Sequence, residues 1–216
     1  MHHRITRAIQ AFARLATCIL VLESTQLSQG FAAQENQIFV AARNLIANKN
    51  SKEAIQLLRK SKGGIKETEQ SEYNFLMARA YQELRNNSQA LDYYSRAIQY
   101  NPNSAKAFTN RGLVKGALQD MSGALNDLNQ SMAIDPTIPE THLNLGVTLA
   151  ALNKPEEALK SFNQALTLNE NYADAYRNRG IVYKHLKQNK KACTDWKKSQ
   201  KIRPSPEIQK TISTHC

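Results

Sequence analysis

The segment NLGVTLAALNKPEEALKSFNQAL, residues 144–166, decides the fold, because its pattern of small, aromatic and proline residues recurs along the chain. Its glycine, Gly146, has counterparts at Gly112 and Gly180, each 34 residues away. Positions at fixed distances after these glycines are also alike: Ala124, Ala158 and Ala192, then Leu128, Phe162 and Trp196, then Ser131, Ala165 and Ser199. A fixed period of this length indicates an array of one unit that buries its apolar face only against its neighbours.

Each unit is predicted to be a hairpin of two helices. In the unit over residues 139–172, apolar side chains occupy two sides of the predicted first helix. Asn153-Lys154-Pro155 then interrupts this pattern. Pro155 suits the start of a second helix over residues 156–168, whose apolar residues keep a helical period. Hydrophobic residues make up 41% of the 216, with only 8 glycines and 6 prolines. This composition excludes a disordered chain and an all-β fold punctuated by turns, so the sequence predicts an all-α protein.

The repeated residues resemble those of the tetratricopeptide repeat (TPR) family, whose helix-turn-helix unit is 34 residues long. The family carries an aromatic residue, Leu-Gly, Tyr, Ala, an aromatic residue, Ala and Pro in that order. The matching residues are Phe108, Gly112, Ala124, Leu128, Ser131 and Pro136, then His142, Leu145, Gly146, Ala158, Phe162 and Ala165, then Tyr176, Gly180, Tyr183, Ala192, Trp196, Ser199 and Pro204. Lys115 departs from the pattern where Tyr is usual, and Glu170 replaces the closing proline. The resemblance implies a right-handed solenoid of about five helical hairpins.

The resemblance also divides the chain into segments. We expect an N-terminal targeting segment over 1–32, a degenerate first repeat over 35–70, four repeats over 71–104, 105–138, 139–172 and 173–206, and a C-terminal tail over 207–216. The first repeat is degenerate because it lacks the glycine and the closing proline, and because it aligns only with two extra residues near 68–70.

The N-terminal segment resembles a secretory signal. Residues 1–7 are basic, 15–22 form an unbroken apolar run, and small residues around Ala32 suit a signal peptidase. We therefore expect export to a periplasm, a lumen or the exterior after cleavage near Ala32. Basic and apolar residues also separate onto two helical faces before Glu23, which is typical of an organelle transit peptide. An uncleaved membrane anchor is the third possibility.

Two cysteines, Cys193 and Cys216, lie beyond the predicted cleavage point. They could form a disulfide that tethers the tail in an oxidising compartment. Alternatively, Cys193 is a small core hydrophobe, because Leu125 and Leu159 occupy the same place in other units. Sequence spacing does not establish the geometry of a bridge, and the second interpretation is favoured.

The charge is basic and uneven. The chain carries a formal net charge of +11, and much of the excess lies in the last repeat and the tail. A terminal repeat needs a polar outer face, which accounts for these residues as a solvated cap. They also suggest an alternative function, a structural or tethering protein that docks on an anionic membrane surface or polyanion. Nucleic acid is not an expected partner, because no recognised motif and no interleaved aromatic residues accompany the charge.

The main candidate site is a row of asparagines. Asn110, Asn144 and Asn178 each lie two residues before a repeat glycine, and an amide offers a donor and an acceptor to the backbone of an extended peptide. In TPR proteins the first helices line the concave surface, so the resemblance implies that these residues face a groove. The expected walls, from helical spacing, are Thr109, Leu113, Leu143, Val147, Arg177 and Ile181, followed one turn later by Lys184 and His185. We expect a groove that is apolar in its middle and basic at its C-terminal end.

No catalytic pattern is present in the sequence. It has no glycine-rich phosphate loop, no paired histidines at metal-ligand spacing and no nucleophile elbow. His142 replaces an aromatic residue of the repeat and is interpreted as packing. The sequence therefore predicts a non-catalytic adaptor without cofactor or metal, whose partner is another protein offering an extended segment. The identity of that protein and the oligomeric state are left open.

Overall fold

The computed structural model describes residues 37–216, so the predictions for the targeting segment, 1–32, lie outside the described residues. The described part of the chain divides into two compact units, with the boundary between Glu67 and Thr68. Every regular element in the described part is a helix, which confirms the all-α prediction. None of the helices over 37–216 is both long enough and apolar enough to cross a membrane.

The first unit contains one helical hairpin in its described part. Residues 37–47 are helical, α2 spans Ser51–Ser61, and a short 3-10 helix, η1, spans Lys62–Gly64. Phe39, Ala42 and Leu58 are buried. A second 3-10 helix, η2 (Glu67–Glu69), follows at the boundary between the units.

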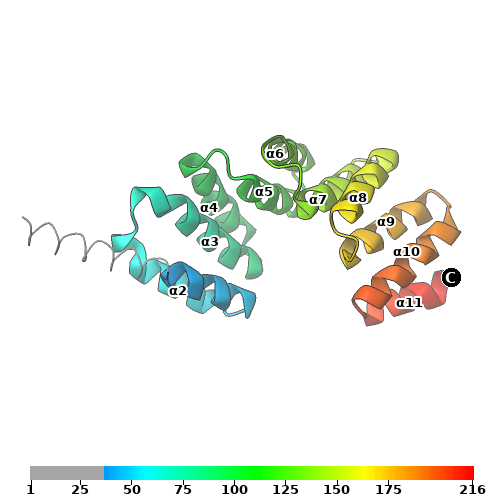
Figure 1. The fold of residues 1–216 in the computed structure, drawn as a ribbon, viewed down its shortest axis with the longest axis horizontal. Coiled ribbons are helices and arrows are strands. Elements are labelled where there is room, and N and C mark those ends of the chain that lie inside the picture. The colour runs from blue at the N-terminus through cyan, green and yellow to red at the C-terminus, as the bar shows by residue number, and fades with distance from the viewer. Residues whose placement is uncertain (1–36) are drawn as a thin grey trace, which may run out of the picture. The chain divides into compact units, whose positions relative to one another are not determined.

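The second unit is a solenoid of antiparallel helix pairs followed by a single helix (Figure 1). The first helices of the pairs are α3 (Gln70–Glu83), α5 (Ala105–Ala117), α7 (Pro139–Ala151) and α9 (Ala173–His185). The second helices are α4 (Asn87–Tyr100), α6 (Met121–Ile134), α8 (Pro155–Leu168) and α10 (Asn189–Ile202). The predicted tail is instead mostly a helix, α11 (Pro206–His215), which packs on α10.

The turn inside each hairpin uses one left-handed residue. Lys49, Arg85, Gln119, Asn153 and Lys187 all have φ between 56° and 65°. The next amide bonds back into the first helix: Lys154 N donates to Leu149 O at 2.9 Å, and Gln188 N to Tyr183 O at 2.8 Å. These bonds satisfy carbonyl groups at the helix end, as in a Schellman motif, although none of the five residues is glycine.

The repeat glycines lie where the two helices of a hairpin approach each other closely. A Cβ atom on Gly146 would lie 2.6 Å from Cε1 of Phe162, and one on Gly180 would lie 2.5 Å from Nε1 of Trp196. Both aromatic side chains are almost fully buried. In these units the small residue therefore lets the two helices approach, and the aromatic residue fills the adjoining space.

Two buried ion pairs join the helices of the second and fourth hairpins of this unit. Arg111 binds Asp127 through two hydrogen bonds of 2.8 Å, and Arg179 binds Asp195 through two of 2.7 Å. The bonds to Asp195 raise the pKa of the Arg179 guanidinium above its ordinary value. Both aspartates are buried, and Lys115 adds a third cationic contact to Asp127 at 2.9 Å.

Each of these arginines also reaches the preceding repeat. Arg111 donates to Oγ of Ser95 at 3.2 Å, and Arg179 donates to Oδ1 of Asn163 at 2.6 Å. Ser95 and Asn163 occupy equivalent places on α4 and α8. One guanidinium thus links three helices, which helps to fix how successive hairpins stack.

The end of the solenoid corrects the interpretation of Cys193 as a core residue. Cys193 is only partly buried and forms a disulfide with Cys216, 23 residues later, with their Cα atoms 5.6 Å apart. The bridge holds the last turn of α11 against α10. Ile208 of α11 is buried beside Trp196, so the helix covers the apolar face that a terminal repeat would otherwise expose.

Candidate functional site

The asparagine row occupies equivalent places on three first helices. Asn110, Asn144 and Asn178 lie on α5, α7 and α9, and each is partly buried. Asn178 donates from Nδ2 to the carbonyl of Asp174 at 2.8 Å. Within residues 37–216, the side-chain amides of Asn110 and Asn144 have no hydrogen-bond partner, so both remain available to a ligand.

A row of exposed aliphatic residues runs beside the asparagines. Leu113, Val147 and Ile181 each lie three residues after an asparagine, and 41%, 43% and 53% of their respective areas are exposed. Side chains three positions apart on a helix share a face. We call the surface formed by these two rows the groove; it offers polar amides next to apolar side chains.

Two predicted wall residues do not face the groove. Thr109 and Leu143, each one position before an asparagine, are buried. Thr109 hydrogen-bonds the hydroxyl groups of Ser131 at 2.7 Å and Thr141 at 2.6 Å. A step of one residue turns a helix by about 100°, which carries these side chains into the packing between helices. They are structural residues, and the prediction that they line the groove is wrong.

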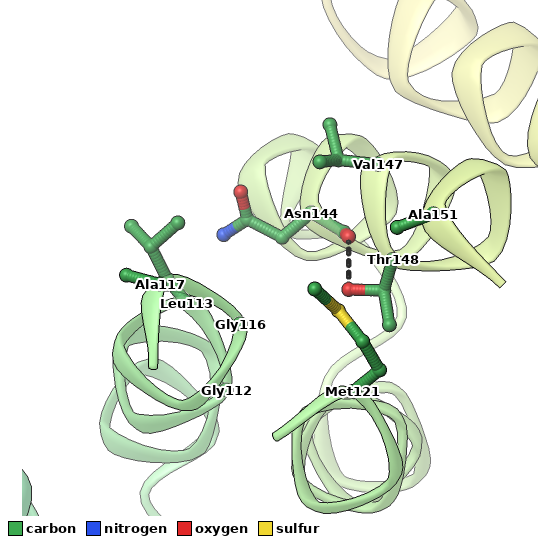
Figure 2. A pocket seen from close by; sticks show the side chains of 9 residues that line it. All are labelled: Gly112, Leu113, Gly116, Ala117, Met121, Asn144, Val147, Thr148 and Ala151. Atoms are coloured by element: carbon green, nitrogen blue, oxygen red, sulfur yellow. Dashed lines mark hydrogen bonds between the residues drawn. The ribbon is translucent and has the colours of Figure 1, made fainter. Parts of the chain in front are cut away.

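A hollow of about 250 Å³ opens in the groove between α5 and α7 (Figure 2). Its lining consists mainly of small and aliphatic groups: Gly112, Leu113, Gly116, Ala117, Met121, Asn144, Val147, Thr148 and Ala151. The Asn144 side chain extends toward α5 across the opening, and Met121 projects from the start of α6 (Figure 2). The Thr148 hydroxyl donates to the backbone carbonyl of Asn144 at 2.9 Å, so that polar group is satisfied. We call this the first hollow.

A second hollow, of about 210 Å³, lies one repeat further along. It is lined by Ala150, Asn153, Pro155, Ile181, Val182 and His185. Five of these residues lie 34 positions after residues that line the first hollow; Asn153 is the exception. The second hollow differs in its polar groups: Asn153 and His185 line it, His185 replaces the small side chain of Ala151, and the counterpart of Asn144 is absent from its lining.

The basic end of the groove is partly neutralised by the protein itself. Arg177, which stands at the same repeat position as Thr109 and Leu143, lies 3.7 Å from Glu207 of α11 and so pairs with that helix, and Arg203 forms an ion pair with Asp174. Lys184 contacts Nε2 of His215 at 2.6 Å. Lys184 and His185 are exposed and have no carboxylate partner among residues 37–216, so Lys184 remains a cationic group at this end and the His185 ring remains accessible.

Sequence reasoning missed two contributors to the site. Met121 and Pro155 stand one repeat apart, at the starts of α6 and α8. Met121 lines the first hollow and Pro155 lines the second. Their 34-residue spacing was a usable signal, but only the structure shows that they reach this surface. His142 is buried and bonds the carbonyl of Pro136 at 2.8 Å, in agreement with a packing role. No group of metal-ligating side chains occurs in the part of the chain that the structure describes.

Comparisons with known proteins agree on the fold. Two family models, both described as tetratricopeptide repeat, match residues 139–172 and 71–104. A solved structure of PilF from Pseudomonas aeruginosa is 15% identical with a TM-score of 0.73, over 86% of this chain and 90% of that chain. A thermophilic TPR protein from Thermus thermophilus is 17% identical with a TM-score of 0.71, over 84% and 98%.

A third solved structure is YrrB, described as a TPR protein with an unusual peptide-binding site. It is 20% identical with a TM-score of 0.60, over 85% of this chain and 96% of that chain. At identities this low, the TM-scores establish that the chains share a fold, and nothing more. No curated protein sequence matches the chain.

Proposed function

Because the chain belongs to the tetratricopeptide repeat family, a fold that serves as a scaffold for protein–protein interaction, we propose that it is a non-catalytic adaptor that binds an extended segment of another protein in the groove. YrrB, which has the same fold, carries a peptide-binding site and supports a ligand of this kind.

The observation that carries the proposal is the pairing of free amides with exposed aliphatic side chains. The side-chain amides of Asn110 and Asn144 have no hydrogen-bond partner among residues 37–216, and neither contributes a buried polar atom that lacks a partner, so both are accessible to a ligand. An extended peptide offers one N–H and one C=O at every residue. Backbone bonds to the asparagines would hold the segment, while Leu113, Val147 and Ile181 would bury its apolar side chains.

We also propose that the protein works in an oxidising compartment. The Cys193–Cys216 disulfide supports this location, because such bonds persist in exported and lumenal proteins and are rare in a reducing cytosol. The signal-like N-terminal sequence points the same way. Cleavage near Ala32 is tested by mass spectrometry of the N-terminus of the protein purified from its host.

The function is tested by capture of partners with and without the asparagines. The full chain and a triple variant, Asn110→Ala, Asn144→Ala and Asn178→Ala, are used as bait in host extract, and bound proteins are identified by mass spectrometry. We expect the triple variant to fold normally and to bind the captured segment more weakly by about 1–3 kcal/mol, since peptide backbone groups then lose their partners. A double variant on α6, Asn126→Ala and Asn129→Ala, is the control because both side chains lie on a second helix, away from the groove.

The salt dependence of binding distinguishes this function from docking through the basic C-terminal end. Backbone hydrogen bonds and apolar contacts weaken little with ionic strength, whereas contacts of exposed lysines are screened within about 10 Å at 0.1 M salt. Partners that are lost in the triple variant but retained at moderate salt support the groove. Partners that bind both baits equally and are removed by salt would transfer the function to the basic surface.

A further inference from the structure

The two hollows of the groove are smaller than typical small-molecule pockets and are suited to single side chains. Their volumes, about 250 and 210 Å³, lie below the roughly 300–1,000 Å³ of pockets that enclose small molecules. They are also two copies of one feature, one repeat apart. A ligand that fills both hollows must therefore present two side chains on one face. The distance between these side chains must equal the distance between neighbouring repeats of the protein.

The spacing of the hollows selects a backbone conformation. The first hollow lies between α5 and α7, and the second is its equivalent on α9. Packed helices are about 8–10 Å apart, so the hollows are separated by about that distance. A polyproline II segment rises about 3.1 Å per residue and turns once in three residues, which places residues i and i+3 on one face about 9 Å apart. A β-strand places i and i+2 on one face only about 6.6 Å apart, and turns i+3 to the opposite face.

The asparagines fit the same conformation. A polyproline II segment has no internal hydrogen bonds, so its backbone groups are all available to a binding partner. Asn144 lies at the opening of the first hollow (Figure 2). Asn178, its equivalent one repeat later, does not line the second hollow, and its Nδ2 already donates to the Asp174 carbonyl, so its Oδ1 is the atom left for a ligand. The Asn144 amide and the Asn178 Oδ1 can therefore bond backbone groups of such a segment at a spacing of one repeat.

The linings of the hollows select the two side chains. Apart from the Asn144 amide and the internally bonded Thr148 hydroxyl, the side chains around the first hollow are apolar, which suits an aliphatic residue. The second hollow keeps apolar walls in Ile181 and Val182 but adds the polar side chains of Asn153 and His185. A glutamate complements this arrangement, because its methylene groups meet the walls and its carboxylate can accept hydrogen bonds from the Asn153 amide and the His185 ring.

We propose that the groove binds a polyproline II segment that places an aliphatic side chain in the first hollow and a glutamate, three residues away, in the second. This inference rests on the proposed peptide-binding function and adds the chemistry of the ligand. It predicts partners that contain proline-compatible, extended segments of this composition.

The test is selection from a phage-displayed library of random peptides on the full chain and on the triple asparagine variant described above. We expect peptides enriched on the full chain to pair an aliphatic residue with an acidic residue at an interval of three, and to lose binding on the triple variant. Asparagine-dependent peptides with another pattern would overturn this inference and leave the peptide-binding function standing. Failure to enrich any asparagine-dependent peptide would overturn both.

Two variants test which hollow binds the aliphatic side chain of the ligand and which binds the acidic one. Gly116→Leu fills the first hollow, and the helix has room for a Cβ there because the nearest atom, Ala124 Cβ, is 4.0 Å away. It should weaken a selected peptide about tenfold, because the aliphatic side chain loses its site. His185→Glu should remove the preference for the acidic residue and leave the aliphatic preference intact. The matched control, Gln164→Glu, places the same new carboxylate on an exposed part of α8 and should change neither preference. Unchanged preferences in both hollow variants would refute the assignment.

Discussion

Replacing Gly146 with alanine should destabilise the protein, although alanine ordinarily stabilises a helix. The new Cβ would lie 2.6 Å from Cε1 and 2.7 Å from Cδ1 of Phe162. Carbon atoms prefer a separation of about 3.5–4.0 Å, so the ring must retreat by roughly 1 Å. Only 1% of Phe162 is exposed, and closely packed neighbours resist that movement.

The expected net loss follows from two opposing contributions. Overpacking of a core costs about 1–3 kcal/mol, while replacing a helical glycine with alanine contributes about 0.5–1 kcal/mol of stability. Gly146→Ala should therefore lower the free energy of unfolding by roughly 1 kcal/mol, and by at most about 2.5 kcal/mol. Gly116→Ala, with 4.0 Å to the nearest side-chain atom, should instead raise it by about 0.5–1 kcal/mol.

Urea denaturation followed by circular dichroism measures both variants under oxidising conditions. The two should shift the midpoint in opposite directions, and by thermal melting each kcal/mol corresponds to about 2–4 °C for a chain of this size. A double variant, Gly146→Ala with Phe162→Leu, provides the cycle that isolates the contact, because a smaller side chain should absorb most of the alanine penalty. If Gly146→Ala stabilises the protein as much as Gly116→Ala does, the close approach of the two helices at this glycine is not real.

Three further predictions concern the free energy of unfolding and use the same denaturation assay. Reducing the Cys193–Cys216 disulfide, which closes a loop over a separation of 23 residues, should lower stability by about 3 kcal/mol, and a fall below about 1 kcal/mol would mean that α11 stays docked without the bond. Arg111→Met should cost about 3 kcal/mol by leaving Asp127 buried with Lys115 as its remaining ion-pair partner, and a neutral result would show that the pair is solvated in solution. Lys187→Gly should stabilise by roughly 0.5–1 kcal/mol, because glycine adopts the observed φ of 58° without strain, and a loss of stability would contradict the left-handed turn.

Several features of the fold and of the site could be predicted because they are local and repeated. The 34-residue period fixes which residues share a helix face, so Gly146, Phe162 and Pro155 reveal the hairpin from the sequence alone. The asparagine row and the aliphatic row follow from the same period. Leu113 and Val147 are exposed beside their asparagines as the helical spacing predicts.

Positions set by packing between distant elements could not be predicted in this way. Thr109 and Leu143 were expected to be walls of the groove, but their exposure depends on which neighbouring helix covers each side of α5 and α7. The wrong interpretation of Cys193 has a similar cause, since its distance from Cys216 is set by how α11 folds back onto α10.

The sequence by itself therefore determined the repeating unit, its helices and the rows of residues that recur with it, because helix period and repeat period are properties of the chain. Only the tertiary structure decided that Met121 reaches the first hollow, that Arg179 links three helices and that His185 stands at the rim of the second hollow. These facts depend on how the side chains of one hairpin fill the space left by the next, and a linear pattern does not contain that packing.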